Sequence, residues 1–131
     1  MAFLLYFGCM KQIMVNGKLL PADEPALAAD NRGYRYGDGL FETLKVVNGQ
    51  IALAGYHFDR LMQGLQLLRF HLPALLTPAR LQEEILRLCR KNGCEQLARV
   101  RLSFSRGSGG LYETGDAPVY LAECWPLADH F

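Results

Sequence analysis

The sequence lacks the short motifs that identify several common classes of nucleotide and metal enzymes. It contains no GxxxxGK[ST] phosphate-binding loop, and His57, His71 and His130 are isolated rather than paired at metal-binding spacing. The closely spaced glycines of residues 33–39 precede an expected strand instead of following one, which excludes a dinucleotide-binding fingerprint. We therefore expect no metal site, and we interpret the histidines as surface or packing residues rather than bases.

An excess of charge of one sign is also lacking, and so is a long apolar run. Lys and Arg number 14 against 13 for Asp and Glu, so the formal net charge of +1 gives no general attraction to nucleic acid or to an anionic membrane. The apolar first ten residues are too few to span a bilayer and lack the features of a secretory signal. We expect a cytoplasmic protein in which residues 1–9 are either an extra, non-native segment or an interface strand.

The cysteines show no pattern of a metal site or a redox motif. Cys9, Cys89, Cys94 and Cys124 are scattered along the chain, without a CxxC or Cys/His metal spacing. Such cysteines are typical of buried free thiols in a reducing compartment. We expect them to pack as small apolar side chains.

Half of the 131 residues are apolar, which is enough for the core of one domain over residues 1–131. Two Asn-Gly pairs predict tight turns, because both residue types tolerate positive φ. Residues 11–20 should form a hairpin about the first pair, Asn16-Gly17, and a second strand pair should flank Asn48-Gly49. Residues 21–39, which are rich in proline and then in glycine, indicate a connecting loop.

Two helices and two further strands follow. Residues 55–70 carry apolar side chains at helical spacing, and residues 78–92 lie between a capping Thr77 and a terminating Gly93. The apolar stripes are Phe58, Leu61, Met62, Leu65 and Leu68 in the first helix, and Leu81, Ile85, Leu88 and Cys89 in the second. Alternating strands then end the chain. This order predicts an α+β fold, an antiparallel sheet with two helices packed on one face.

The strand after the glycines has two different faces, because side chains alternate along it. Leu40, Glu42, Leu44 and Val46 share one face, and Phe41, Thr43, Lys45 and Val47 share the other. The second face mixes an aromatic ring, a hydroxyl and a cation, so it either lines a cavity or is an exposed sheet face.

Arg60 is the candidate anion-binding residue of the first helix. It lies near the helix start, where unpaired N–H groups and the helix dipole favour anions, and its guanidinium could hold a phosphate through two hydrogen bonds. The alternative is a surface ion pair with Asp59 or Glu24.

Three motifs in order carry a resemblance to a known family. "NRGYRYGDGLFETLKV" (residues 31–46), then "NGQI" (48–51), then "HFDRL" (57–61), closely resemble the N-terminal domain of class IV, or fold type IV, pyridoxal-phosphate (PLP) enzymes. The family includes branched-chain and D-amino-acid aminotransferases and 4-amino-4-deoxychorismate lyase. The resemblance runs from about residue 10 to the end of the chain.

This resemblance implies a role for each of five residues. Arg60 would hold the cofactor phosphate. Phe41 would line the substrate pocket with Lys45 near it on the same strand face, and Tyr36 would belong to a loop that reaches the neighbouring subunit's site in a dimer. Arg106 would open a loop that helps to bind substrate carboxylate. The glycines of residues 33–39 would provide positive φ and close backbone approach rather than phosphate contacts.

The same resemblance implies that the catalytic lysine is missing. In the family, the lysine that forms a Schiff base with the cofactor belongs to a second domain. The four lysines here do not match it: Lys11 and Lys18 flank a hairpin, Lys91 ends a helix, and Lys45 matches a pocket position. We expect no catalytic residue in this chain, weak PLP binding and no transaminase activity by the chain alone.

The reaction remains open between two members of the family. Glu42 in "FET" resembles the aminotransferases, with a branched-chain-like enzyme expected, whereas "SRGSGG" (residues 105–110) resembles the chorismate lyases. The absence of an "RxH" motif after the loop glycines argues against a D-amino-acid aminotransferase. A non-catalytic oligomerisation or binding module is a further alternative. RNA binding through "YRY" and "RVRLSF" is disfavoured by the charge balance and the absence of an RRM signature.

Overall fold

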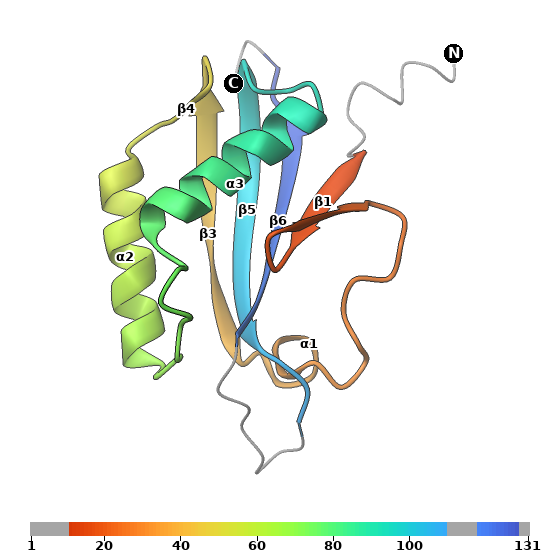
Figure 1. Ribbon diagram of the computed structural model, residues 1–131, viewed down its shortest axis with the longest axis vertical. Coiled ribbons are helices and arrows are strands. Elements are labelled where there is room, and N and C mark those ends of the chain that lie inside the picture. Colours follow the sequence, from red (N-terminus) through yellow and green to blue (C-terminus); the bar gives the residue numbers. More distant parts are fainter. Residues whose placement is uncertain (1–10, 110–117, 129–131) are drawn as a thin grey trace.

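The computed structural model describes residues 11–109 and 118–128, which form one sheet with three helices (Figure 1). The strands are β1 (Gln12–Val15), β2 (Lys18–Pro21), β3 (Gly39–Val47), β4 (Gln50–Ile51), β5 (Leu97–Arg106) and β6 (Pro118–Pro126). The helices are α1 (Arg32–Tyr36), α2 (Ala54–Leu67) and α3 (Pro78–Lys91). None of these helices is long and apolar enough to cross a membrane.

The six strands are ordered β2-β1-β6-β5-β3-β4, and every neighbouring pair is antiparallel. The longest ladders join β5 to β3 and to β6, with Gly39 opposite Ser105 at one end of the first ladder and Val47 opposite Leu97 at the other. β4 pairs only with the last two residues of β3. The first half of β3 therefore has no strand on its outer side within the described residues.

The two long helices cover one face of this sheet, with α3 crossing in front of β5 and β6 and α2 lying beside β3 (Figure 1). Phe58, Leu61 and Leu65 of α2 and the stripe of α3 meet the inward side chains of β3, β5 and β6 in a single buried cluster. Leu68 was predicted for the α2 stripe, but it lies just beyond the end of the helix and is 39% exposed. The stripe predicted for α3 is buried throughout: Leu81, Ile85, Leu88 and Cys89. The α+β prediction, with two helices on one face, is confirmed.

Local signals also identify the turns and the ends of α3 correctly. Asn16, Gly17, Asn48 and Gly49 all have positive φ, which is the conformation that a two-residue hairpin turn requires. The Thr77 side chain accepts a hydrogen bond from the backbone N–H of Arg80, so it caps α3 as expected.

One local prediction is wrong, because residues 31–39 are not wholly a loop. Arg32–Tyr36 form the short helix α1. The side-chain oxygen of Asn31 accepts from the N–H of Tyr34, and Gly37 ends the helix in the left-handed conformation at φ 67°. A helix N-cap and a glycine C-cap thus enclose a single turn, which periodicity over longer windows does not detect.

Candidate active site

The open face of the sheet carries a hollow of about 470 Å³ above the start of β3. Phe41 and Arg101 line it, with the Arg101 guanidinium 3.9 Å from the centre of the Phe41 ring. Tyr34 of α1 belongs to its wall, and Ser103 and Glu123 supply polar groups. This face of β3 was predicted either to line a cavity or to be an exposed sheet face, and each alternative is partly correct. Phe41 is 54% exposed, and it also lines the hollow.

Glycines allow the chain to pass close to β5 beside this hollow. A Cβ atom on Gly39 would lie 2.2 Å from the backbone oxygen of Phe104, a separation that no real side chain permits. Gly37 supplies the positive φ at the end of α1. The prediction that these glycines serve close approach and positive φ is confirmed at both positions.

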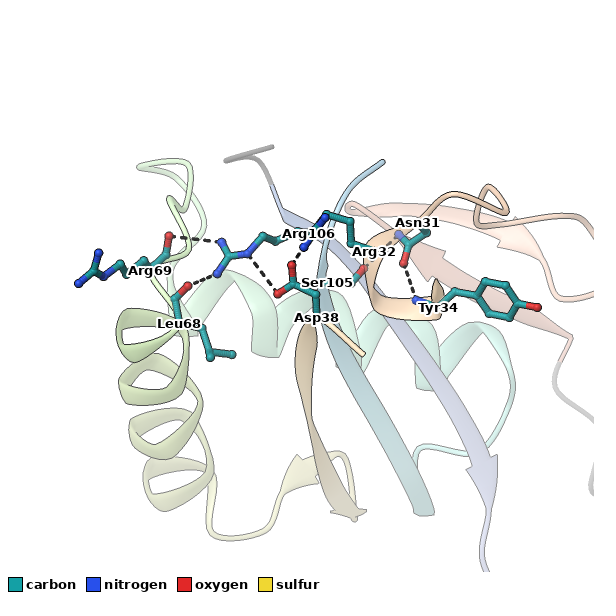
Figure 2. A network of polar contacts seen from close by, with 8 residues as sticks. All are labelled: Asn31, Arg32, Tyr34, Asp38, Leu68, Arg69, Ser105 and Arg106. Carbon is teal, nitrogen blue, oxygen red and sulfur yellow. Dashed lines mark hydrogen bonds and ion pairs between the residues drawn. The ribbon is translucent and has the colours of Figure 1, made fainter. Parts of the chain in front are cut away.

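A network of arginines and one aspartate fixes the end of the sheet next to α1 (Figure 2). Asp38 accepts hydrogen bonds from the Nε atoms of Arg32 at 2.8 Å and of Arg106 at 3.2 Å. The Arg106 side chain is 13% exposed. The ion pair between Arg106 and Asp38 therefore connects the end of β5 to the residue just before β3.

Arg106 also joins this network to the C-terminal end of α2 (Figure 2). Its terminal nitrogens donate to the backbone oxygens of Leu68 and Arg69, and its guanidinium lies 4.4 Å from the centre of the Phe70 ring. A cation in this position satisfies carbonyl groups that a helix end leaves without partners. The residue predicted to open a substrate-binding loop is thus held in place by α2 and Asp38.

On the helical side of β3, a buried carboxylate holds Arg60. The Glu42 side chain is 6% exposed and accepts two hydrogen bonds from Arg60, from Nε at 2.6 Å and from a terminal nitrogen at 2.8 Å. His57 Nδ1 lies 3.1 Å from the same carboxylate. The hydrogen bonds from Arg60 lower the pKa of Glu42 below its ordinary value of 4.5, although burial opposes this effect. The same interaction raises the pKa of Arg60.

The expected ion-pair partners of Arg60 are therefore wrong. Its partner is Glu42, 18 residues earlier in the sequence, and not Asp59 or Glu24. Adjacent helical residues such as Asp59 and Arg60 point in different directions, whereas α2 lies directly over the inward face of β3. Because α2 begins at Ala54, Arg60 also lies in its second turn, beyond the unpaired N–H groups of the first.

The outer part of Arg60 faces a second hollow. Its side chain is 72% exposed, although Glu42 anchors it. With Phe41, Thr43 and Gly64 it lines a concave surface of about 370 Å³ between α2 and the open edge of β3. Phe41 lines both hollows, so the structure places one of the residues predicted for the substrate pocket beside Arg60, the residue predicted for the phosphate.

The other predicted site residues lie outside these two hollows. Tyr36 is 41% exposed, and the Arg32 guanidinium lies 5.0 Å from its ring centre. Lys45 is exposed on the same strand face as Phe41, opposite Arg99 of β5. Sequence reasoning did not identify the buried partner Glu42, although a carboxylate in the apolar stripe of a strand is a signal for a paired cation.

Three of the cysteines are buried free thiols, as predicted: Cys89, Cys94 and Cys124. Cys124 is 30 residues from Cys94 in the sequence, but the three thiols lie together between α3 and the sheet. Residues 1–9, Cys9, His130 and most of the loop after Arg106 are outside the described residues.

Comparison with known proteins finds both aminotransferases and a lyase among the relatives of this chain. A putative branched-chain-amino-acid aminotransferase of Methanocaldococcus jannaschii is 30% identical over 100 residues, covering 76% of this chain and 34% of that protein. An aminodeoxychorismate lyase of Bacillus subtilis is 30% identical over 113 residues, covering 83% of this chain and 38% of that protein. The chain thus spans little more than a third of the length of these relatives.

A solved structure of a hypothetical aminotransferase is similar to this chain as well. A hypothetical aminotransferase from Mycobacterium tuberculosis, in its PLP-bound form, has a TM-score of 0.72 and 29% identity over 91% of this chain and 40% of that one. The family profile described as amino-transferase class IV matches residues 39–127, which include Phe41, Glu42, Arg60 and Arg106. With the fold and these matches in agreement, the chain belongs to the class IV amino-transferase family.

Proposed function

We propose that this chain forms the phosphate-binding part of a PLP-dependent class IV enzyme and that Arg60 holds the cofactor phosphate. The observation that carries the proposal is the fixed orientation of Arg60, whose guanidinium is held by buried Glu42 while the side chain remains 72% exposed at a hollow. An anion site needs a cation that is both positioned and accessible.

The residues present fit a phosphate group. Two nitrogens of the guanidinium bind Glu42, which leaves its remaining N–H groups for a ligand in the hollow of about 370 Å³. Glu42 balances the charge of Arg60, and His57 beside them adds a positive charge when it is protonated.

Phe41 supports the substrate side of the proposal. Its ring borders the hollow beside Arg60 and the larger hollow on the open face of the sheet. In the proposed enzyme, this ring packs against an amino-acid side chain and excludes water. Lys45 and Tyr36 then act at the margin of the pocket, Tyr36 in the neighbouring subunit of a homodimer, and Arg106 positions the loop that contacts the substrate carboxylate.

When bound, PLP supplies an electron sink that stabilises negative charge at the amino-acid α-carbon. The contribution of this chain is to bind and orient. We assign the lysine that bonds to the cofactor to a part of the enzyme outside these 131 residues, and we expect these residues alone to hold PLP weakly and to show no turnover.

For the reaction, we propose transamination of a branched-chain-like amino acid in the cytoplasm. The 30% identity to the Methanocaldococcus jannaschii protein over 76% of the chain supports this choice. The second candidate is elimination from 4-amino-4-deoxychorismate, because the Bacillus subtilis lyase matches a longer stretch, 113 residues. Assays of the complete enzyme for both reactions would distinguish them: amino-group transfer to 2-oxo acids without elimination supports transamination, and the reverse result assigns the lyase.

The phosphate role is tested by replacing Arg60 in the complete enzyme. We expect Arg60→Ala to weaken PLP binding by at least about tenfold, measured by equilibrium dialysis and by the absorbance of bound cofactor. Arg60→Lys should recover part of the affinity. Arg90→Ala, which removes an exposed arginine of α3 that lines neither hollow, should leave the affinity unchanged. Unaltered PLP affinity in Arg60→Ala would disprove the role.

A further inference from the structure

Three thiols from separate parts of the chain converge in the core. Cys89 lies near the end of α3, Cys94 follows that helix, and Cys124 lies in β6. Their sulfur atoms all lie within 4.8 Å of one another, and those of Cys94 and Cys124 are 3.5 Å apart. Cys89 and Cys124 are fully buried, and Cys94 is 6% exposed. The proposed PLP site uses none of them.

The spacing of the sulfur atoms fits a single metal ion. Three sulfur ligands placed in a plane at 2.3 Å from one ion are about 4.0 Å apart. The observed separations therefore need only small side-chain movements to reach this arrangement. The donor set contains sulfur alone, which favours soft metal ions over Mg²⁺ or Ca²⁺.

The surroundings of the three sulfurs indicate three ligands rather than four. No fourth metal-ligating side chain joins the cluster within residues 11–109 and 118–128. The nearby Asn92 amide is already engaged: its oxygen accepts from the N–H of Gln12, and its nitrogen donates to the Gln12 oxygen and to Cys124 Sγ at 3.0 Å. Zn²⁺ in structural sites is almost always four-coordinate, so it fits this donor set poorly.

One further contact reaches the cluster from outside it. The Asn92 side-chain N–H donates a hydrogen bond to Cys124 Sγ at 3.0 Å, which favours negative charge on that sulfur. Cysteine binds a metal ion as the thiolate, so binding releases thiol protons and should weaken as the pH falls.

We propose that Cys89, Cys94 and Cys124 form a buried, three-coordinate sulfur site for a soft monovalent metal ion of the Cu(I) class. The ion joins α3, the turn after it and the strand β6, so binding stabilises the packing of the helix on the sheet. Because the site is closed, the ion enters when the chain folds or when the turn at Gly93 and Cys94 opens.

The test uses the full 131-residue chain, reduced and free of oxygen, with Cu(I) added either to the folded protein or during refolding. We expect one copper ion per chain, an ultraviolet thiolate-to-copper absorption band and a higher thermal midpoint. At a denaturant concentration at which the metal-free chain is alkylated at its buried thiols, copper should protect three of them. Cys94→Ala and Cys124→Ala should each weaken copper binding by at least about tenfold. Cys9→Ala is the matched control and should still bind one ion.

Several results would overturn the proposal. They are no copper uptake by the unaltered chain, equal or tighter binding of Zn²⁺, loss of the ion in Cys9→Ala, and a mass decrease from disulfide formation in place of metal uptake. If Cys124→Ala does not fold, as judged by circular dichroism, Cys94→Ala and the alkylation pattern of the unaltered chain decide the question.

Discussion

The buried carboxylate of Glu42 on β3 accepts two hydrogen bonds from the exposed guanidinium of Arg60 on α2, at 2.6 and 2.8 Å. This pairing joins the central part of the sheet to the helix that covers it. It also fixes the direction of the residue that we propose for phosphate binding. A side chain that is 72% exposed would otherwise sample many conformations.

The first prediction concerns the pH dependence of this pair. The pKa of Glu42 is lowered in the folded chain, so the pairing stabilises the fold above the ordinary value of 4.5 and this contribution is lost as the pH falls through the folded pKa. At pH 7 we expect Glu42→Gln to reduce the free energy of unfolding by roughly 1–3 kcal/mol. Denaturant unfolding from pH 7 to pH 3 should show this difference shrinking toward zero.

Glu83→Gln on the surface of α3 serves as the control, because this carboxylate has no ion pair among the described residues. Its effect on stability should be small at every pH. A Glu42→Gln deficit that stays constant between pH 7 and pH 3 would show that Glu42 acts through packing and not through its charge.

The second prediction compares two glycines. Gly39→Ala would place a Cβ 2.2 Å from the Phe104 oxygen, so β3 and β5 must separate. We expect this change to reduce the free energy of unfolding by about 1–3 kcal/mol. Gly55→Ala in α2 meets nothing within 4 Å and should leave stability unchanged or raise it by up to about 1 kcal/mol. Thermal unfolding of both variants checks the pair, and equal effects would contradict the predicted close approach.

The sequence predicts those features of the fold that depend on near neighbours. The Asn-Gly turns and the ends of α3 follow from residues two or three positions apart, and their outcome matches the prediction. The single turn of α1 is missed, because its signal is only a cap at Asn31 and another at Gly37.

Contacts between distant residues are harder to predict. Which carboxylate reaches Arg60 depends on how α2 lies across β3, and the sequence instead suggested Asp59 and Glu24 as candidates. The convergence of Cys89, Cys94 and Cys124 likewise depends on how α3 docks on β6, so their irregular spacing in the sequence gave no sign of it. The strand face that carries Glu42 could be predicted from the sequence, whereas the pairing of Glu42 with Arg60 could not.

The third prediction concerns the cap of α3. The Thr77 hydroxyl accepts a hydrogen bond from the Arg80 N–H, which otherwise has no partner within the helix. We expect Thr77→Ala to lower the free energy of unfolding by about 1 kcal/mol, as measured by urea denaturation. Thr77→Ser keeps the hydroxyl and should retain most of the stability. Equal losses in both variants would argue against the capping role.

The last prediction concerns Arg106, which connects Asp38 to the C-terminal end of α2. Arg106→Ala removes a cation from carbonyl oxygens at a helix end and from a half-buried carboxylate. We expect a loss of roughly 1–3 kcal/mol in the free energy of unfolding. Arg106→Lys keeps the charge but lacks the planar fork that contacts several acceptors, so it should recover only part of this loss.

Where the Arg106→Ala variant loses protection shows whether Arg106 stabilises the end of α2 specifically or the whole domain. Hydrogen exchange should become faster at the amides of Leu68 and Phe70, which bond to Gly64 and Leu65 at the end of α2, before it changes in β5 or β6. Arg101→Ala is the control, because its guanidinium lies over an exposed ring and contacts no helix end. If Arg106→Ala accelerated exchange equally in α2 and in the central strands, Arg106 would stabilise the whole domain and would have no specific role in holding the end of α2 against the start of β3.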